Sequence, residues 1–358
     1  MTRANTFRSR KIVINQHIQC TTAKLLGMPL IKRLPVFTLL TPLLAANVSF
    51  ASEHPYHWSV VWENDAIAND DGGYTNGFAL NGGHLLTPEN NEQWEQKATR
   101  WLPFPQNTSY QEAVSFQLAH AIYTPSDIDT AELIEDDRPY AGLLLGALNL
   151  YRFDTKRSSR YEFVIGVIGP ASGAEYIQRY IHDVIGTVDP SGWDHQIGNE
   201  IVVRAGYEQL WRLYESELSN GIEYDLLSAA DIRAGNLSSD IGGGFSFRFG
   251  SGLASSFPMA WLIPGRTLPA LAGSQSGDWN VFATLYANYV FNDITIEGNT
   301  FKDSHGVHLV NEQALYVVGG SYRFSNWMFS GSVKENSHEF EESGESTMFG
   351  SFSFSFLW

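Results

Sequence analysis

The chain has few charged residues, only one cysteine and no long apolar run beyond residue 51. Charged residues make up 17% of its 358 residues, whereas hydrophobic residues make up 43% and aromatic residues 13%. So little charge combined with so many aromatic side chains excludes a disordered chain or a coiled coil. No stretch beyond residue 51 offers the roughly 20 consecutive apolar residues that a transmembrane helix needs, which excludes a polytopic helical membrane protein.

Positive charge is scarce as well. The chain holds 23 Lys and Arg residues against 39 Asp and Glu residues, so its formal net charge is −16 at pH 7. Proteins that bind nucleic acid neutralise phosphates with a basic surface. The acidic balance therefore argues against a nucleic-acid partner.

The first 51 residues differ in composition from the rest. They contain seven Lys and Arg residues, no Asp or Glu, and the only cysteine, Cys20. From Met28 two basic residues precede an apolar stretch over 34–46 and a small-x-small sequence at 49–51, an order typical of a secretory signal peptide. We therefore predict an N-terminal extension and signal peptide over 1–51, with Met28 as the expected true start. A core helix is the alternative, but two prolines in the stretch would break it.

Alternation with a period of two dominates the sequence from Ser52 onward. Phe245 and Phe247 alternate with Ser246 and Arg248, and the last residues, 352–358, place an aromatic at every second position. An apolar face opposite a small or polar face is typical of a barrel with lipid outside and a polar lumen. A soluble β-sandwich would also alternate. The terminal aromatic strand, which resembles the recognition signal of bacterial outer-membrane barrels, favours the barrel.

The alternating segments predict an all-β fold, a 12-stranded antiparallel transmembrane β-barrel. The expected strands span 57–65, 73–86, 112–123, 141–154, 159–169, 200–216, 220–235, 240–250, 279–291, 312–324, 326–337 and 346–358. With both termini in the periplasm, the odd-numbered connections face outward, and most segments rich in His, Asp, Asn and Gly fall there. Two long connections on the other side, 87–111 and 251–278, carry no recognisable chemistry.

The first outward segment collects oxygen-bearing side chains. Asn64 and Asp65 are followed by Asp70, Asp71 and Thr75 around glycine turns. Carboxylate, amide and hydroxyl oxygens suit a hard cation such as Ca²⁺. Because Asp, Asn and Gly are also the commonest turn residues, a solvated turn is the alternative.

Two further outward segments are less specific. Segment 136–142 contains Arg138 and could hold an ion pair or an anion, although we favour a rigid turn from the sequence alone. Segment 297–304 could supply polar contacts or simply fill a loop.

The remaining outward segment predicts one amphipathic helix in an extracellular loop, over 174–185 and ending at Gly186. A helical wheel places Gln178 and His182 along the border of its apolar face. The apolar face comprises Ile177, Tyr180, Ile181, Val184 and Ile185. Such a helix would pack on the barrel rim or on lipid. His182 is then a candidate general base beside an apolar substrate, and a histidine merely hydrogen-bonded to the rim is the alternative.

Taken together, these motifs resemble the outer-membrane lipid A 3'-O-deacylase family. The resemblance runs in order across most of the chain and is densest between 57 and 200. The matching motifs are Asn64-Asp65, Tyr74-Thr75-x-Gly77, Ile122-Tyr123-Thr124-Pro125-Ser126, Asp137-Arg138-Pro139-Tyr140-Ala141, Gly169-Pro170, Gln178-x-x-x-His182 and Trp193-x-x-Gln196. The resemblance implies that residues 52–358 form a barrel enzyme in the bacterial outer membrane, with its active site facing the outer leaflet. The implied reaction is hydrolysis of the ester that joins the 3'-linked acyloxyacyl chain to lipid A.

The resemblance also implies partners and site residues. Lipid A within lipopolysaccharide and other outer-membrane lipids are the implied partners, and a monomer is expected. Asn64, Thr75, Gln178 and His182 match catalytic positions, and Asp65 matches a ligand of a divalent cation, with Ca²⁺ as the expected ion.

Two departures from the family pattern concern the same site. No lysine occurs between Ser126 and Asp137, where the family carries one, and Val188 with Asp189 beside it stands where the family has a glutamate. These changes bear on the acyl position and the level of activity more than on the fold.

A bound cation would stabilise the oxyanion while His182 activates water, with no serine nucleophile. Ser126, Ser172 or Ser191 could act as a nucleophile instead. A porin-like or structural barrel without catalysis and an outer-membrane phospholipase are the alternative functions.

Overall fold

The computed structural model describes residues 56–65, 73–86, 94–105, 110–257, 275–343 and 346–357. The predicted signal peptide over 1–51 lies outside the described residues, as do Asp70, Asp71 and Trp358.

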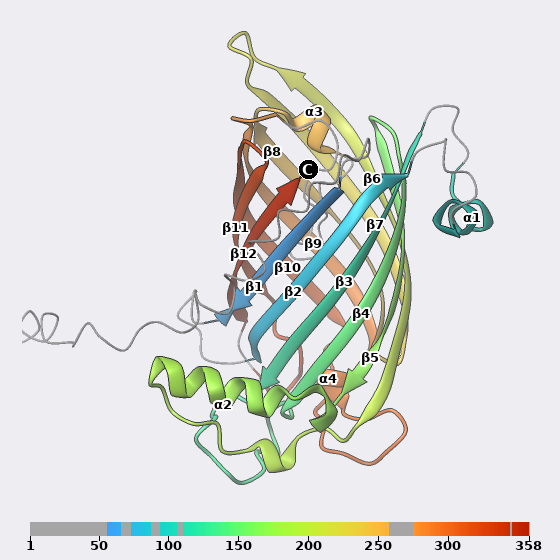
Figure 1. Ribbon diagram of the computed structural model, residues 1–358. Helices are drawn as coiled ribbons and strands as arrows, with labels where there is room; N and C mark the ends of the chain where they lie inside the picture. The colour runs from blue at the N-terminus through green and yellow to red at the C-terminus, as the bar shows by residue number, and fades with distance from the viewer. Residues whose placement is uncertain are drawn as a thin grey trace, which may run out of the picture. The chain divides into compact units, whose positions relative to one another are not determined.

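Twelve antiparallel strands form a closed barrel in which β1 pairs with β12 (Figure 1). The strands are β1 Tyr56–Asn64, β2 Gly73–Leu86, β3 Gln111–Thr124, β4 Ala141–Phe153, β5 Arg157–Ile168, β6 Glu200–Glu217, β7 Glu223–Gly235, β8 Ser238–Gly250, β9 Trp279–Asp293, β10 Glu312–Phe324, β11 Trp327–Asn336 and β12 Thr347–Leu357. The predicted number, order and antiparallel sense of the strands are confirmed. The largest difference is at β7, which begins three residues later than predicted because residues 218–221 form a hydrogen-bonded turn, with 2.9 Å from Gly221 N to Leu218 O.

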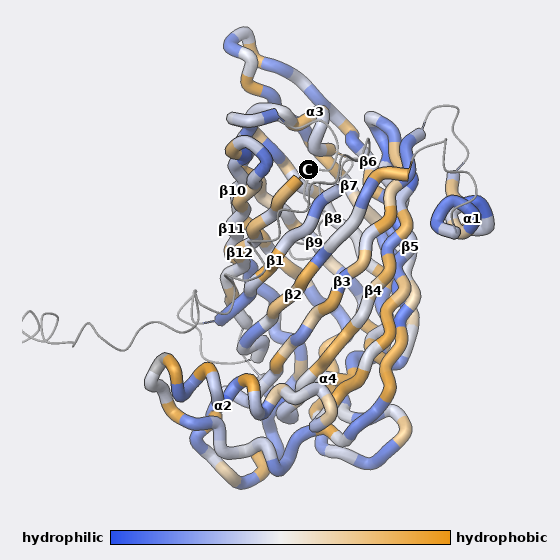
Figure 2. Tube along the Cα trace, in the orientation of Figure 1, coloured by the Kyte–Doolittle hydropathy of each residue, from blue (hydrophilic) through white to orange (hydrophobic). Residues whose placement is uncertain are grey.

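The alternation sorts side chains between the outer wall and the lumen. Phe245 and Phe247 of β8 are 54% and 48% exposed, whereas Ser246 and Arg248 between and after them are buried. Figure 2 shows hydrophobic residues recurring along the strands of the wall, with mostly hydrophilic loops at the ends. The apolar side therefore faces outward, as a barrel surrounded by lipid requires.

Four α-helices interrupt the described connections. They are α1 Trp94–Trp101, α2 Ala174–Ile185, α3 Leu253–Ser256 and α4 Ile294–Glu297. The prediction has α2 with the same bounds and misses the other three. Among the described residues, no helix combines the length and apolar character needed to cross a membrane.

Ion pairs fill the lumen. Arg204 pairs with Glu162 at 3.1 Å, and Arg248 with Asp225 at 2.5 Å, and all four side chains are largely buried. At the end of the barrel opposite to α2, Arg248 Nη2 also donates to the carbonyl of Leu253 in α3, at 3.0 Å. Helix α3 therefore lies against the lumen.

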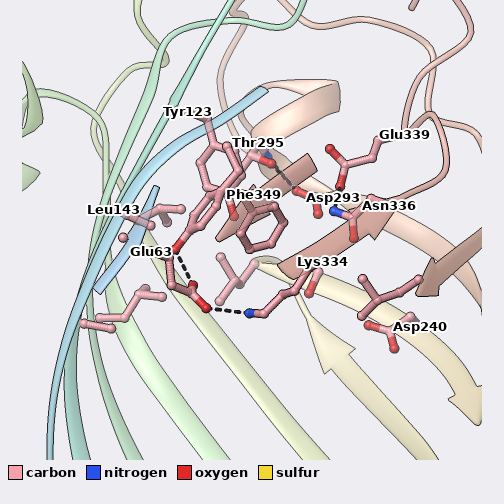
Figure 3. A pocket seen from close by; sticks show the side chains of 18 of the residues that line it. Glu63, Tyr123, Leu143, Asp240, Asp293, Thr295, Lys334, Asn336, Glu339 and Phe349 are labelled. Atoms are coloured by element: carbon pink, nitrogen blue, oxygen red, sulfur yellow. Dashed lines mark hydrogen bonds and ion pairs between the residues drawn. The ribbon is translucent and has the colours of Figure 1, made fainter. Parts of the chain in front are cut away.

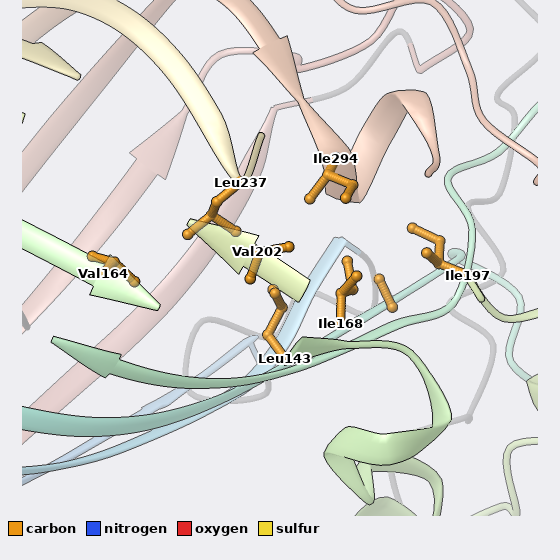
Figure 4. Close-up of a cluster of buried hydrophobic side chains, with 8 residues drawn as sticks. Leu143, Val164, Ile168, Ile197, Val202, Leu237 and Ile294 are labelled. Carbon is orange, nitrogen blue, oxygen red and sulfur yellow. The ribbon is translucent and has the colours of Figure 1, made fainter. Parts of the chain in front are cut away.

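An apolar cluster packs the outer end of the barrel (Figure 4). It comprises Ala141, Leu143, Val164, Ile168, Ile197, Val202, Leu237 and Ile294. Together with the ion pairs, this cluster occupies much of the described lumen, which disfavours the porin-like alternative.

Candidate active site

A cavity of about 340 Å³ lies within the barrel toward its outer end (Figure 3). The carboxylate of Glu63, which points into it, accepts hydrogen bonds from Tyr74 Oη at 2.8 Å and from Lys334 Nζ at 2.5 Å. The residues that line this cavity include none of the five predicted site residues. Successive residues of a strand point to opposite sides, so Glu63 faces the lumen while Asn64 faces the outer wall.

Asn64 and Thr75 meet on the outer side of the wall, at the ends of β1 and β2. Asn64 Nδ2 donates to the carbonyl of Thr75 at 2.7 Å, and the hydroxyls of Thr75 and Thr124 are 2.7 Å apart. A register shift between Tyr74 and Asn76 in the β2–β3 ladder marks a β-bulge, and a bulge re-aims the side chain at its extra residue. This irregularity brings Thr75 to Thr124 of the neighbouring strand.

Asp65 directly follows β1 and is buried. Among the described residues, no three His, Cys, Asp or Glu side chains form a group that could hold a metal ion. The chemistry of Asp65, Asn64 and Thr75 nevertheless fits a hard cation, because carboxylate, amide and hydroxyl oxygens are the donors that Ca²⁺ accepts. A cation here would take its other ligands from backbone carbonyls or water.

Helix α2 packs closely against β3 and β4 on the outer side of the wall. A Cβ atom at Gly142 in β4 would lie 2.1 Å from Cβ of Ala174, so only glycine allows this approach. Beside this contact, an apolar cluster joins β3, the helix and the segment after it. Its members are Ile122, Tyr140, Ala174 and Trp193, with Ile128 and Ile177 packed against them.

The structure shows which side of the helix packs on the wall. The helical wheel places Gln178 and His182 at the border of the apolar face, and both are buried, at 2% and 9% exposure. Tyr180 and Val184, which the sequence places on the apolar face for the barrel rim or for lipid, are exposed. The buried line runs through positions spaced by four, starting at Ala174, because the contact with Gly142 sets the rotation of the helix.

Gln178 ties the helix to the segment that follows it. Its Oε1 accepts a hydrogen bond from Nε1 of Trp193 at 2.8 Å, and its Nε2 is buried without a hydrogen-bond partner. The Trp193 ring lies 4.9 Å from that of Tyr140. Burial raises the pKa of Tyr140 to about 12, so its hydroxyl stays protonated at neutral pH and donates to the Ile128 carbonyl at 3.3 Å.

His182 is oriented by the turn that ends the helix. The backbone amides of Gly186 and Thr187 both donate to the carbonyl of His182, at 2.8 and 3.1 Å. The turn brings the carbonyl of Val188 to 2.5 Å from Nδ1 of His182. Because a carbonyl can only accept, Nδ1 carries the proton and the lone pair lies on Nε2. This hydrogen bond therefore favours the neutral tautomer in which Nε2 is the nitrogen that can accept a proton.

Helix α2 is long enough to carry His182 toward β1 and β2. From Ala174, which lies against β4, the axis rises to His182 by about 12 Å. The three strand spacings from β4 to β1 amount to about 14 Å. In Figure 1 the helix runs along this rim from the β5 side toward the β1 side.

The segment around Arg138 holds an ion pair and is not a simple turn. Its guanidinium is buried, 3.0 Å from Glu339 and 3.1 Å from the hydroxyl of Thr295, and it lies over the ring of Tyr123 at 4.6 Å. It thereby joins three outer connections. Segment 297–304 also supplies polar contacts, since the Asn299 side chain exchanges two 2.8 Å hydrogen bonds with the backbone of Gly198.

Sequence reasoning missed two contributors to this site. Thr124 enters the sequence prediction only as part of a motif. The predicted pairing of the second and third strands already places Thr124, at the end of the third strand, beside Thr75. The carbonyl of Val188 had no signal in the sequence, because a backbone acceptor does not depend on residue type.

Comparison with curated proteins found no match to this sequence. Among solved structures, LpxR from Salmonella typhimurium superposes with a TM-score of 0.69 at 20% identity, covering 84% of this chain and 99% of that one. This likeness shows a shared fold. The beta domain of the Bordetella autotransporter BrkA, with a TM-score of 0.42 at 8% identity over 85% of this chain and 98% of that one, adds nothing to it.

One family model matches nearly the whole chain, the motifs and the barrel included. The model described as outer membrane protein LpxR covers residues 34–358. In agreement with the resemblance seen in the motifs, the chain belongs to the outer membrane protein LpxR family.

Proposed function

We propose that this protein is an outer-membrane lipid A deacylase that hydrolyses the ester of the 3'-linked acyloxyacyl chain. Membership of the LpxR family supports the enzyme class. The observation that carries the proposal is the buried, tautomer-fixed His182 on a helix packed against the outer, lipid-facing wall. A base in that place serves a substrate that lies in the membrane.

His182 acts as the general base. Its Nε2 takes a proton from a water molecule as that water attacks the ester carbonyl. The bond between the acyl carbon and the 3' oxygen then breaks, and the proton passes to the departing oxygen. The products are a free acyloxyacyl acid and a lipid A with a 3' hydroxyl. The hydrogen bond from Nδ1 to Val188 stabilises the positive charge that the ring gains during the transfer.

The carbonyl of Val188 explains how this chain functions without the glutamate of the family. The acceptor that orients the ring comes from the backbone, and the Val188 side chain is exposed. Asp189 is not required for this hydrogen bond.

A divalent cation, with Ca²⁺ as the expected ion, would be held by Asp65 with Asn64 and Thr75, and would supply positive charge to the carbonyl oxygen. The residues themselves are preorganised. The bond from Asn64 to the Thr75 carbonyl fixes the amide, and the contact with Thr124 fixes the Thr75 hydroxyl.

The exposed side of α2 supports an acyl substrate. Tyr176, Tyr180 and Val184 recur at intervals of four and are exposed, so they form an apolar stripe beside the wall. Lipid-facing residues in the middle of β2 and β3, such as Leu80 and Leu118, are exposed as well. Acyl chains can pack against both surfaces.

A serine mechanism has less support. The hydroxyl of Ser172 is buried, donates to the carbonyl of Gly169 at 2.7 Å and accepts from the amide of Ala174 at 3.3 Å. The hydroxyl is therefore held in the turn that precedes the helix. Ser191 is half-buried, and its Oγ donates to the Asp189 carbonyl at 3.4 Å.

Mass spectrometry of lipid A from cells that express the protein tests the proposal. The wild type should remove the 3'-linked acyloxyacyl group, and His182→Ala should lose on the order of 10² to 10⁴ in rate. His308→Ala is the matched control, because His308 is an exposed histidine in another outer loop. Unchanged lipid A with the wild type would reject the enzyme, and release of fatty acid from glycerophospholipids alone would indicate a phospholipase.

A second experiment addresses the cation. Activity of purified protein in detergent should disappear after exhaustive chelation and return with Ca²⁺. Asp65→Asn keeps the shape of the side chain but removes its charge, so it should weaken both cation affinity and turnover. Full activity in the chelated protein would reject the cation and redirect attention to a serine.

A further inference from the structure

The periplasmic connection that contains α1 lies against the outer wall of the barrel. Val114 of β3 and Leu150 of β4 occupy positions on the lipid-facing side of their strands, yet both are buried. They are covered by Phe104, with Leu102 and Ala98 packed against the same cluster. Residues 94–104, within a connection that carried no recognisable chemistry in the sequence, therefore cover part of the outer wall at the end opposite to α2 (Figure 1).

Arg152 clamps this segment to the wall. Its guanidinium pairs with Glu112 at 2.8 Å and donates to the carbonyl of Thr99 in α1 at 3.5 Å. The same guanidinium lies over the rings of Phe104 at 4.8 Å and Tyr110 at 4.3 Å. The Arg152 guanidinium thus contacts a carboxylate, a backbone carbonyl and two aromatic rings. These contacts hold α1 at one position on the wall.

Two further aromatic residues of the outer wall, Tyr161 of β5 and Tyr207 of β6, continue from Phe104. Tyr161 Oη donates to the carbonyl of Pro103 at 3.4 Å, and its ring lies 4.9 Å from Phe104 and 4.8 Å from Tyr207 of β6. Aromatic girdles of this kind mark the boundary between hydrocarbon and headgroups on membrane barrels. The segment 94–104 therefore lies at the height of the periplasmic interface.

The outer surface of α1 is apolar and basic. Trp101 is 89% exposed and Trp94 is 50% exposed, and the Trp94 ring lies 6.2 Å from lipid-facing Phe116 of β3. Lys97 and Arg100 are exposed on the same short helix. Tryptophan prefers the headgroup level of a bilayer, and lysine and arginine reach its phosphates.

We propose that residues 94–104, the α1 segment, bind glycerophospholipids of the inner leaflet and anchor this side of the barrel at the periplasmic interface. Trp94 and Trp101 insert between acyl chains just below the headgroups, while Lys97 and Arg100 contact phosphates. A phospholipid is favoured over a second copy of the chain because the contact from Trp94 to Phe116 makes the α1 surface continuous with the lipid-facing wall. This surface is separate from the proposed catalytic site at the other end of the barrel.

Site-directed spin labelling of the full chain tests the anchor. A nitroxide is attached at Trp101→Cys, with Cys20 replaced by serine, and the protein is reconstituted in vesicles of phosphatidylethanolamine and phosphatidylglycerol. Asn220→Cys is the matched control, since Asn220 is exposed in the β6–β7 turn at the same end of the barrel. Collisions with oxygen should dominate at position 101, and collisions with a water-soluble nickel complex should dominate at position 220. Heat-dependent gel mobility verifies that each variant is folded.

Two outcomes would overturn the proposal. Equal access of the nickel complex to positions 101 and 220 would show that the segment faces water. Spin–spin broadening at 101 that disappears on mixing with unlabelled protein would show that a second copy covers it. Arg152→Met tests the clamp separately: the label at 101 should become mobile and gain contact with nickel, and an unchanged spectrum would refute the role of Arg152.

Discussion

Replacing Gly186 with alanine tests whether the turn after α2 orients the imidazole of His182, the proposed general base. Gly186 has φ of 74°, and a Cβ atom there would meet no heavy atom within 4 Å. The substitution therefore acts through backbone conformation alone and not through a clash. The turn is what brings the Val188 carbonyl to Nδ1 of His182.

The expected loss follows from the cost of left-handed backbone. An L-residue other than glycine is disfavoured in this conformation by about 1–2 kcal/mol. If the turn relaxes to another backbone conformation to relieve this strain, the population of molecules in which His182 keeps its orientation falls roughly 5–30-fold. We therefore expect kcat to fall by a factor in that range while the barrel stays equally stable.

The assay is the initial rate of release of the 3' acyl group by purified protein in detergent. Gly277→Ala is the matched control, because Gly277 has φ of 98°, precedes β9 at the periplasmic end, and likewise leaves a Cβ atom with no heavy atom within 4 Å. It should lose no activity. A Gly186→Ala enzyme with the full rate would refute the role of the turn, and an equal loss in Gly277→Ala would assign the effect to general strain.

Three further predictions concern the outer loops and the lumen. Arg138→Met leaves the half-buried carboxylate of Glu339 without its ion-pair partner, so the free energy of unfolding should fall by at most about 3–5 kcal/mol in denaturant titrations, and adding Glu339→Gln should recover part of it. Glu342 accepts a hydrogen bond from His308 and raises the pKa of that histidine above 6.5, so this loop contact is present at acidic pH and is lost as pH rises through the raised value. An NMR titration should place the His308 midpoint lower in Glu342→Gln, and an unchanged midpoint would contradict the pairing. In planar bilayers the protein should show no steady ion conductance, and porin-sized current steps would contradict the packed lumen.

Features that depend on local periodicity could be predicted from the sequence. Alternation of apolar and polar residues is a property of each strand, so it predicted twelve strands, their order and the lipid-facing side before any contact was known. The bounds of α2 followed in the same way from the apolar spacing and from Gly186 at its end. The family motifs added Asn64, Asp65, Thr75 and His182 as site residues, and their catalytic and cation-binding roles stay predictions.

How these elements meet depends on long-range contacts that only the folded chain contains. Periodicity shows which face of a helix is apolar but not what it packs on. The close contact of Ala174 with Gly142 decides which side of α2 faces the wall. The partner of Arg138 is 201 residues away along the chain, and no local pattern connects two such positions. The acceptor for His182 is a backbone carbonyl, which any residue at 188 would supply and which residue identity therefore does not reveal. Long-range packing and backbone geometry thus decide the arrangement of a candidate site of which the sequence shows only the side chains.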